Sequence, residues 1–286
     1  MIDATLPIAR TVADLRRRLD AWRAAGQTIG MVPTMGALHE GHLSLVAQAR
    51  ARADRVIATL FVNPTQFAPG EDFEAYPRDE AHDAALLAGA GCDLLFAPSA
   101  QDMYPPGFAT AITVSGVSEP LDGQARPAHF SGVATVVAKL LIQARPDVAV
   151  FGEKDYQQLL VVKRLALDLD LPTEILGAST VRAEDGLALS SRNAYLSPRE
   201  REIAANLNVV LLNLAHTLAD GAPVGPAEAE AVEALLAAGF DSVDYVEARH
   251  ADTLERLGPG LIDDAPARVL AAVRLGKTRL IDNRAV

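Results

Sequence analysis

The chain has 286 residues, 50% of them hydrophobic and 22% charged, so it can bury one large core or two ordinary ones and is not a disordered or fibrous protein. Lys and Arg total 26 against 37 Asp and Glu, and the net charge of -11 opposes nonspecific binding to DNA or RNA. The single cysteine, Cys92, excludes an intramolecular disulfide and a cysteine-based zinc cluster, which fits a reducing cytoplasm.

The sequence predicts neither a secretory signal peptide nor a membrane span. Met1 to Pro7 carries an early acid and a proline, and no apolar run of signal-peptide length follows Arg16–Arg18. The richest apolar stretch, Val209 to Leu214, is interrupted by Asn213 and is far shorter than the roughly 18 residues that a span needs. We therefore expect a soluble, cytoplasmic protein.

Strands and helices are predicted to alternate up to about Thr180. Apolar positions at helical spacing begin at Thr11, and Gly26 should end that first helix. Short apolar runs predict strands over 28–32, 56–62, 93–96, 147–151 and 173–176. Further helices are predicted over 43–53, 79–88, 134–143 and 157–167. This alternation indicates a mostly parallel sheet with helices on both faces.

The pattern changes after Thr180. A loop rich in Arg, Asp, Gly and Ser (181–194) is followed by predicted helices and then strands: helices over 198–219 and 226–238, strands over 243–248, 267–273 and 278–281. We therefore predict an α/β fold, with a parallel-sheet domain over residues 1–180 and a smaller α+β domain over 181–286.

The first segment that could carry chemistry runs from Val32 to His42, between a predicted strand and a predicted helix. Free N–H groups and the helix dipole favour a phosphate at a helix N-terminus. His39 and His42 would stand beside it as hydrogen-bond donors. Alone, such a pair is more often two solvated turn histidines, and its spacing does not fit a His-Glu-x-x-His zinc helix.

A second segment, residues 151–158, also joins a predicted strand to a predicted helix. Its side chains are therefore expected at the same carboxyl edge of the sheet as the first segment. Lys154 could supply a positive charge to a phosphate, and Asp155 could accept hydrogen bonds from ribose hydroxyls. The alternative is a solvated turn with a charged cap.

A third segment contains Ser190, Ser191 and Arg192, in the loop at the predicted domain junction. Two hydroxyls and a guanidinium can grip a polyphosphate and then move with it. Taken alone, the segment is typical of a polar linker.

Two further polar loops offer binding groups. Gln66, in the loop after the second strand, carries an amide suited to a hydroxylated or carboxylated small molecule. Arg126 and His129 precede a helix and are possible anion contacts, although each alone is typical of a surface loop. Gly276-Lys277-Thr278 superficially resembles a P-loop, but Ala271 stands where that motif needs glycine, so Lys277 is predicted in a hairpin turn.

Taken together, the motifs resemble the pantothenate synthetase family (pantoate–β-alanine ligases). They occur in that family's order and approximate spacing, and the resemblance spans the chain. The segments are Val32 to His42, Phe61 to Phe67, Tyr76-Pro77-Arg78, His129 to Val133, Gly152 to Gln158 and Ser190 to Asn193. Two departures are visible: Leu189 stands where methionine is usual, which preserves apolar volume, and Thr65 stands where methionine is frequent, which leaves Gln66 intact.

The resemblance implies a Rossmann-like first domain of the nucleotidyltransferase group, related to class I aminoacyl-tRNA synthetases, and a second domain acting as a lid. His39 to His42 is similar to the group's His-x-Gly-His signature, and Ala188 to Arg192 to its mobile Lys-Met-Ser-Lys-Ser loop. The implied reaction is ATP-dependent condensation of pantoate with β-alanine through a pantoyl adenylate, with release of pyrophosphate and AMP. A homodimer, and Mg²⁺ carried on the ATP phosphates, are implied as well.

The resemblance also implies roles for individual residues. Catalytic contacts to phosphate fall to His39, His42, Lys154, Ser190, Ser191 and Arg192. The wider ATP site would add Pro33, Thr34, Met35, Gly36, Gly41, Gly152, Asp155, Val181 and Leu189. Pantoate would be held by Pro33, Met35, Gln66 and Gln158, and β-alanine by Gln66.

Two rival functions are considered. A nucleotidylyltransferase would share the His-x-Gly-His turn but would form a dinucleotide rather than an amide, with no need for Gln66 and Gln158 to meet at a carboxylate. A non-catalytic ATP-binding module could lose the histidines, Lys154 or the Ser-Ser-Arg loop, all of which are present.

Overall fold

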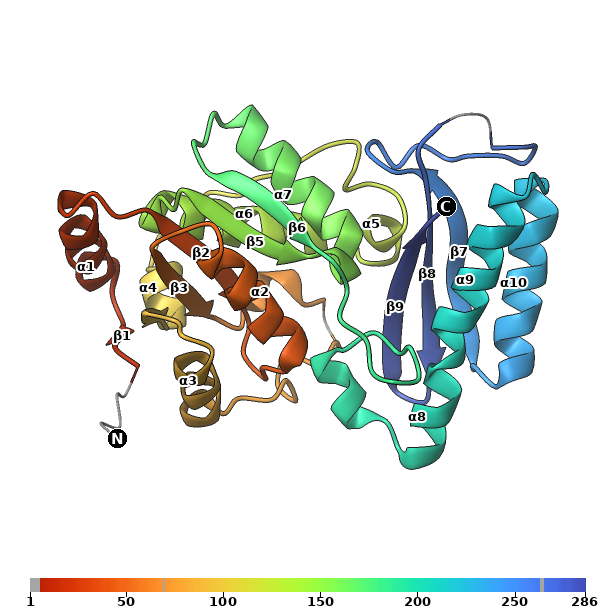
Figure 1. Cartoon of the computed structure of the whole chain (residues 1–286), viewed down its shortest axis with the longest axis horizontal. Coiled ribbons are helices and arrows are strands. Elements are labelled where there is room, and N and C mark those ends of the chain that lie inside the picture. Colours follow the sequence, from red (N-terminus) through yellow and green to blue (C-terminus); the bar gives the residue numbers. More distant parts are fainter. Residues whose placement is uncertain (1–5, 69, 263–264) are drawn as a thin grey trace. The chain divides into compact units, whose positions relative to one another are not determined.

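The computed structural model describes residues 6–68, 70–262 and 265–286, and its contacts divide the chain into two compact units (Figure 1). The first unit comprises Met1–Ser118, Asp122–Glu153 and Gln158–Ser179. The second comprises Glu119–Leu121, Lys154–Gln157 and Thr180–Val286. Met1 to Thr5, part of the segment on which the absence of a signal peptide is predicted, lie outside the described residues. Within the described part, every helix is too short or too polar to cross a membrane.

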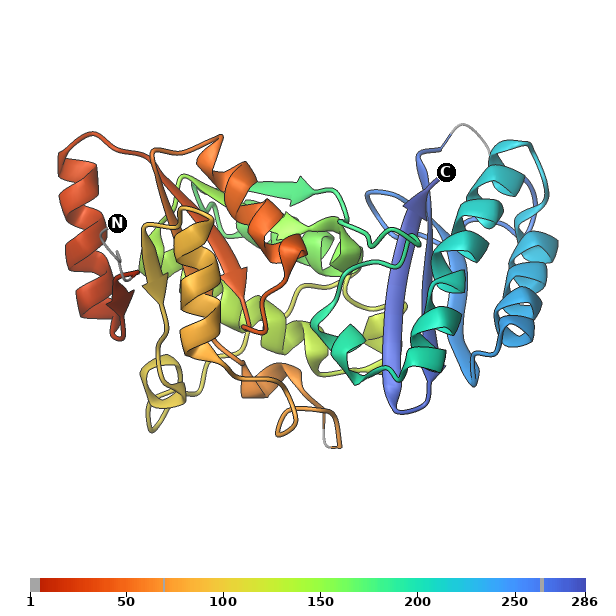
Figure 2. The same ribbon diagram turned by 60° about the horizontal axis from the view of Figure 1, so that its bottom comes forward.

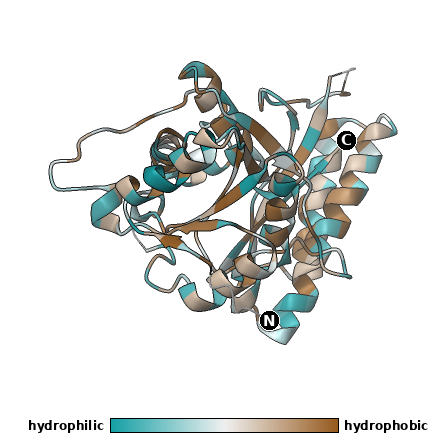
Figure 3. Ribbon diagram, turned by 60° about the vertical axis from the view of Figure 1, so that its left-hand side comes forward, coloured by the Kyte–Doolittle hydropathy of each residue, from teal (hydrophilic) through white to brown (hydrophobic). Residues whose placement is uncertain are grey.

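The first unit is built on a six-stranded parallel sheet in the order β1-β4-β3-β2-β5-β6. Its strands are β1 (Ile8–Ala9), β2 (Ile29–Thr34), β3 (Arg55–Leu60), β4 (Leu94–Phe96), β5 (Val148–Gly152) and β6 (Glu174–Ala178). The central strands are almost continuously buried, as expected of a parallel sheet covered on both faces. Figure 3 shows hydrophobic colouring along these strands.

Helices α2 (Glu40–Arg50) and α3 (Glu80–Gly89) pack together with alternate residues of the strands in one apolar cluster. Right-handed crossovers place α1 (Val12–Ala24), α6 (His129–Ala144) and α7 (Tyr156–Asp168) on the opposite face (Figure 2). The short helices α4 (Ala100–Met103), α5 (Asp122–Ala125), η1 (Pro64–Gln66) and η2 (Glu153–Asp155) lie in connections.

The order of the strands reverses between β2 and β5. From β2 the chain moves through β3 to β4 on one side, and β5 and β6 then add on the other side of β2. The ladder between β2 and β5 joins Gly30 to Val148 and Met31 to Ala149, and both strands continue beyond it. Open α/β sheets bind ligands beyond the carboxyl ends of the strands at such a reversal.

The second unit is an antiparallel sheet, β7 (Ser242–His250), β8 (Ala267–Leu275) and β9 (Thr278–Ala285), in the order β7-β8-β9. Helices α9 (Asn206–Ala219) and α10 (Val224–Ala238) form an apolar core with it. The helices η3 (Ser191–Tyr195) and α8 (Pro198–Ala204) lead into α9. Gly276 and Lys277 form the hairpin turn between β8 and β9, as predicted.

The α/β fold class is confirmed, whereas the functional division into a domain over 1–180 and a lid over 181–286 stays a prediction. The single helix expected over 198–219 is wrong, because α8 and α9 are separated at Ala205. There the Asn206 side-chain amide donates to the carbonyl of Ile203 (2.9 Å) and competes with the helical backbone bonds. Part of the expected loop over 181–194 is the helix η3, which Ser190 caps.

Candidate active site

The turn between β2 and α2 has a strained backbone that a buried carboxylate supports. Gly36 and Ala37 both have positive φ, 87° and 52°. Asp83 of α3, 1% exposed, accepts hydrogen bonds from the N–H groups of Ala37 (2.9 Å) and Leu38 (2.8 Å). A Cβ at position 36 would lie 2.9 Å from the Asp83 carboxylate, so glycine is required there. Asp83 therefore fixes the approach to the N-terminus of α2.

His39 and His42 close that N-terminus with a reciprocal cap. Nδ1 of His39 accepts from the N–H of Gly41 (3.1 Å), and Nδ1 of His42 accepts from the N–H of His39 (3.3 Å). The ring centroids are 4.1 Å apart. Because each Nδ1 accepts a backbone proton, the neutral rings carry their own proton on Nε2. Both histidines are thus locked in the tautomer that can donate a hydrogen bond through Nε2.

At the end of β2, the side chain of Thr34 is occupied by hydrogen bonds within the protein. The Thr34 hydroxyl donates to the carbonyl of Thr59 (2.6 Å) and accepts from the N–H of Gly36 (3.3 Å). Its side chain is therefore engaged in holding β2 to β3. The predicted contact of Thr34 with ATP would fall to its main chain, whereas Pro33 and Met35 are half-buried.

A chain of side-chain hydrogen bonds orients Gln66 in the loop after β3. Tyr104 donates to Oδ1 of Asn63 (2.8 Å), and Nδ2 of Asn63 donates to Oε1 of Gln66 (3.2 Å). Nε2 of Gln66 in turn lies 3.0 Å from Sδ of Met35. Two residues predicted to hold pantoate, Met35 and Gln66, are therefore in contact. Asn63 and Tyr104, which the sequence reasoning gave no role, set the orientation of the Gln66 amide.

Arg126 and His129, considered from the sequence as possible anion contacts, are both engaged by protein groups. Arg126 pairs with Glu71 (2.6 Å), and although burial raises the pKa of Glu71, this guanidinium holds it below its usual value. The His129 Nδ1 is 2.9 Å from the carbonyl of Gln66. Burial, followed by the charge of Arg126, lowers the pKa of His129 to about 4, so the ring is neutral near pH 7.

Two predicted binding residues of the first unit lie at the end of β5 and beyond it. Gly152 ends the strand, and a Cβ at this position would meet nothing within 4 Å. Gln158 lies in the first turn of α7 and is half-buried. Strand β5 is the neighbour of β2. Both residues are therefore expected near the carboxyl ends of these two strands, where the His39–His42 turn also begins.

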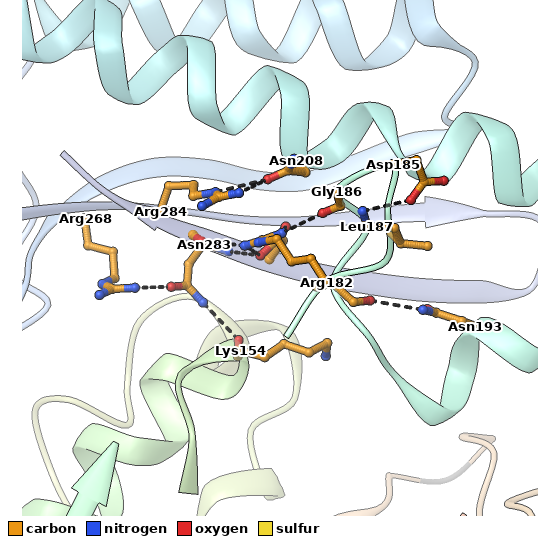
Figure 4. A network of polar contacts seen from close by, with 12 residues as sticks. Lys154, Arg182, Asp185, Gly186, Leu187, Asn193, Asn208, Arg268, Asn283 and Arg284 are labelled. Atoms are coloured by element: carbon orange, nitrogen blue, oxygen red, sulfur yellow. Dashed lines mark hydrogen bonds and ion pairs between the residues drawn. The ribbon is translucent and has the colours of Figure 1, made fainter. Parts of the chain in front are cut away.

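Lys154 and Asp155 belong to the second unit, where β9 holds their turn (Figure 4). The Asn283 side chain donates through Nδ2 to the carbonyl of Lys154 (3.0 Å). The Lys154 ammonium lies 3.9 Å from the Asp155 carboxylate, which is 49% exposed. The Lys154 side chain itself is only 19% exposed, and at this distance Asp155 gives its ammonium no close hydrogen bond.

The segment from Val181 to Asn193 is ordered by local bonds and by one buried ion pair. The N–H of Leu189 donates to the carbonyl of Val181 (3.0 Å). Arg182 makes a two-pronged contact with Asp282 of β9 (2.7 and 2.9 Å). Ser190 caps η3 through the N–H of Arg192 (3.3 Å), and Ser190, Ser191 and Arg192 are all partly exposed. The Arg182–Asp282 ion pair thus anchors the base of the loop that is predicted to bind phosphate.

The predicted site residues fall into two sets, one in each unit. The first unit brings together Pro33, Thr34, Met35, Gly36, His39, Gly41, His42, Gln66, Gly152 and Gln158 around the carboxyl ends of β2, β3 and β5. The second unit holds Lys154, Asp155, Val181, Leu189, Ser190, Ser191 and Arg192. Among the supporting residues that the sequence reasoning missed, Asp83 had a signal, since it is a charged residue four positions before the buried Leu87 in the same helix.

Comparisons with known proteins agree over the whole chain. Residues 7–285 match the model of the family described as pantoate-beta-alanine ligase. The pantothenate synthetase of Caulobacter vibrioides is 66% identical over 279 residues, which cover 98% of both chains. The crystal structure of pantothenate synthetase from Thermus thermophilus is similar with a TM-score of 0.91 and 48% identity, over 98% of this chain and 99% of that one. The crystal structure of the pantoate-beta-alanine ligase from Francisella tularensis, in complex with beta-gamma ATP and beta-alanine, is similar with a TM-score of 0.82 and 34% identity. The match covers 98% of this chain and 97% of that one.

Proposed function

Because the chain belongs to the pantoate–β-alanine ligase family, we propose that its residues form pantothenate from pantoate and β-alanine in two ATP-dependent steps, through a pantoyl adenylate. The observation that carries this proposal is the pair His39 and His42, which caps the N-terminus of α2 beside the strand reversal. Such a terminus attracts phosphate oxygens, and two fixed Nε2–H donors beside it suit phosphoryl chemistry.

In the first step a carboxylate oxygen of pantoate attacks the α-phosphorus of ATP. A bond forms between that oxygen and phosphorus, the bond from the α-phosphorus to the bridging oxygen breaks, and pyrophosphate leaves. The reaction needs positioning and neutralisation of phosphoryl charge rather than a protein nucleophile. Those donors would be His39, His42, Lys154, Ser190, Ser191 and Arg192.

Pantoate would lie against Pro33 and Met35, with the amides of Gln66 and Gln158 on its polar groups. The fixed orientation of the Gln66 amide supports this assignment, because a preoriented amide loses little entropy on binding. The nucleoside would be held by Gly152, Asp155 and the main chain of Val181, and the phosphates by the α2 N-terminus and Leu189 to Arg192.

In the second step the amine of β-alanine attacks the acyl carbon of the adenylate. The carbon–nitrogen bond forms, the bond to the AMP oxygen breaks, and the nitrogen loses a proton. We place β-alanine near Gln66. Adenylation makes this step possible because AMP is a far better leaving group than an oxide or hydroxide.

Three further properties belong to this proposal. Mg²⁺ would be carried on the ATP phosphates, since it prefers oxygen ligands and keeps several of its waters. The enzyme would act as a homodimer in the cytoplasm. Its partners would be pantoate, β-alanine and ATP, without nucleic acid or membrane.

The test has two readouts. Incubation with ATP, Mg²⁺, pantoate and β-alanine is expected to give pantothenate, detected by mass spectrometry. With ATP, Mg²⁺ and pantoate but no β-alanine, the enzyme should exchange labelled pyrophosphate into ATP. If exchange appears only after β-alanine is added, the proposed pantoyl adenylate intermediate is refuted. A dinucleotide product would support the rival nucleotidylyltransferase.

A further inference from the structure

We propose that Asn283 is a positioning residue for Lys154, and that it acts by fixing the main chain of the turn that presents the ammonium. The inference rests on the phosphate-binding role proposed above for Lys154. It goes beyond that role because Asn283 lies on β9, well over a hundred positions later in the sequence, and would touch no substrate.

The Asn283 amide is held at both ends (Figure 4). Nη1 of Arg268 donates to its Oδ1, and its Nδ2 donates to the carbonyl of Lys154 (3.0 Å). Arginine is only a donor and a carbonyl only an acceptor, so this orientation of the amide is the one that the neighbours allow. Asn283 is 3% exposed, which shields both bonds from water.

A second contact holds the same turn. The guanidinium of Arg268 lies over the ring of Tyr156, 3.8 Å from its centroid. Tyr156 is two residues beyond Lys154 and also belongs to the second unit. Arg268 therefore supports the turn in two ways, through Asn283 and through the stacked ring.

The alternation of β9 extends this anchoring to the other phosphate-binding segment. Successive residues of a strand point to opposite faces. Asn283 holds the Lys154 turn, whereas the adjacent Asp282 holds Arg182 at the base of the loop that leads to Ser190. One strand of the second unit thus supports both groups of residues that would bind phosphate there.

The geometry matters for rate because the Lys154 side chain is long and its contact with Asp155, at 3.9 Å, includes no close hydrogen bond. The position of Nζ depends on the orientation of the main chain from which it extends, and a displacement of about 1 Å can cost about 100-fold in rate. Truncating Asn283 leaves the Lys154 carbonyl and an Arg268 N–H without this shared partner. We expect the turn to move and the first half-reaction to slow.

A double-mutant cycle on the full-length enzyme tests the inference. Asn283→Ala is expected to slow pantoate-dependent pyrophosphate exchange about 10-fold or more in the parent, but less than about 2-fold in Lys154→Ala. Amide formation from preformed pantoyl adenylate should stay near the parental rate. Loss by the same factor in both backgrounds, or equal loss in both half-reactions, would assign Asn283 to the fold and overturn the inference.

Two further variants separate the remaining outcomes. Arg279→Gln removes an ion pair of β9 with Asp244 of β7 (2.7 Å), four residues before Asn283, so it is the stability control and should leave the ratio of the two half-reactions unchanged. Arg268→Lys keeps the charge and serves in the same cycle if Asn283→Ala does not fold. Parental exchange in Lys154→Ala would overturn both the role of Lys154 and this inference, whereas loss there with parental exchange in Asn283→Ala would overturn the inference alone.

Discussion

Replacing Asp83 by asparagine is expected to weaken the β2–α2 turn and to shift its backbone. The carboxylate accepts one hydrogen bond on each oxygen, from the N–H groups of Ala37 and Leu38. In asparagine one oxygen becomes an NH₂ group, so a donor would face a donor in a site that is 1% exposed. Loss of one charge-assisted bond and weakening of the other should lower the free energy of unfolding by about 2–4 kcal/mol.

The same helix offers a matched control. Asp79 caps α3 by accepting from the N–H of His82 (3.0 Å), at an exposed position. Asparagine caps a helix about as well as aspartate, so Asp79→Asn should leave stability nearly unchanged while removing the same charge. Urea denaturation of both variants measures the difference, and pyrophosphate exchange should fall only in Asp83→Asn, because only that change displaces His39 and His42. Coincident urea curves would refute our account of the turn.

Three further predictions address the site. His42→Ala and Lys154→Ala should each slow adenylate formation about 10²–10³-fold, yet both should recover much of the amide-forming rate when given preformed adenylate. Single-turnover measurements compare the two half-reactions, and an equal loss in both would exclude these residues from a specific role in the first step. Gln66→Ala or Gln158→Ala should weaken apparent pantoate binding by about 1–3 kcal/mol with little change for ATP, and an unaltered KM for pantoate would exclude them from the site. Because the pKa of His129 is lowered to about 4 from 6.5, the unfolded chain binds the proton first, so stability should decrease as pH falls from 6.5 toward 4. His129→Gln should lack that slope in urea titrations between these pH values, and a slope equal to the parent's would contradict the buried neutral ring.

The parallel-sheet architecture could be predicted because its signal is local. Buried strands such as β2 and β5 are continuous apolar runs. Gly26 and Gly276 have positive φ, and they mark the end of α1 and the turn between β8 and β9. The separation of α8 from α9 could not be predicted from spacing, because the apolar pattern continues across Ala205. It depends on the side chain of Asn206, which bonds to the preceding turn of backbone.

The candidate site divides in the same way. His39, His42, Gln66 and Lys154 stand in turns after strands, where position in the chain already suggests a binding edge. Asp83, Tyr104 and Asn283 act through partners distant in the sequence; helical spacing places Asp83 on the buried face of α3, but no periodicity names the partner of any of the three. The partners of Arg126 and His129, which are Glu71 and the carbonyl of Gln66, could likewise not be predicted from the sequence.

The route of the chain through Lys154–Gln157 also bears on how the protein responds to cleavage. These four residues belong to the second unit, although the segments on either side of them belong to the first. A protease that cuts the exposed Glu184–Asp185 stretch would leave Lys154 on one fragment and its supports, Asn283 and Arg268, on the other. The nicked halves would therefore not be self-sufficient domains, and separate production of residues 1–180 and 181–286 would give the second fragment without a segment of its own fold.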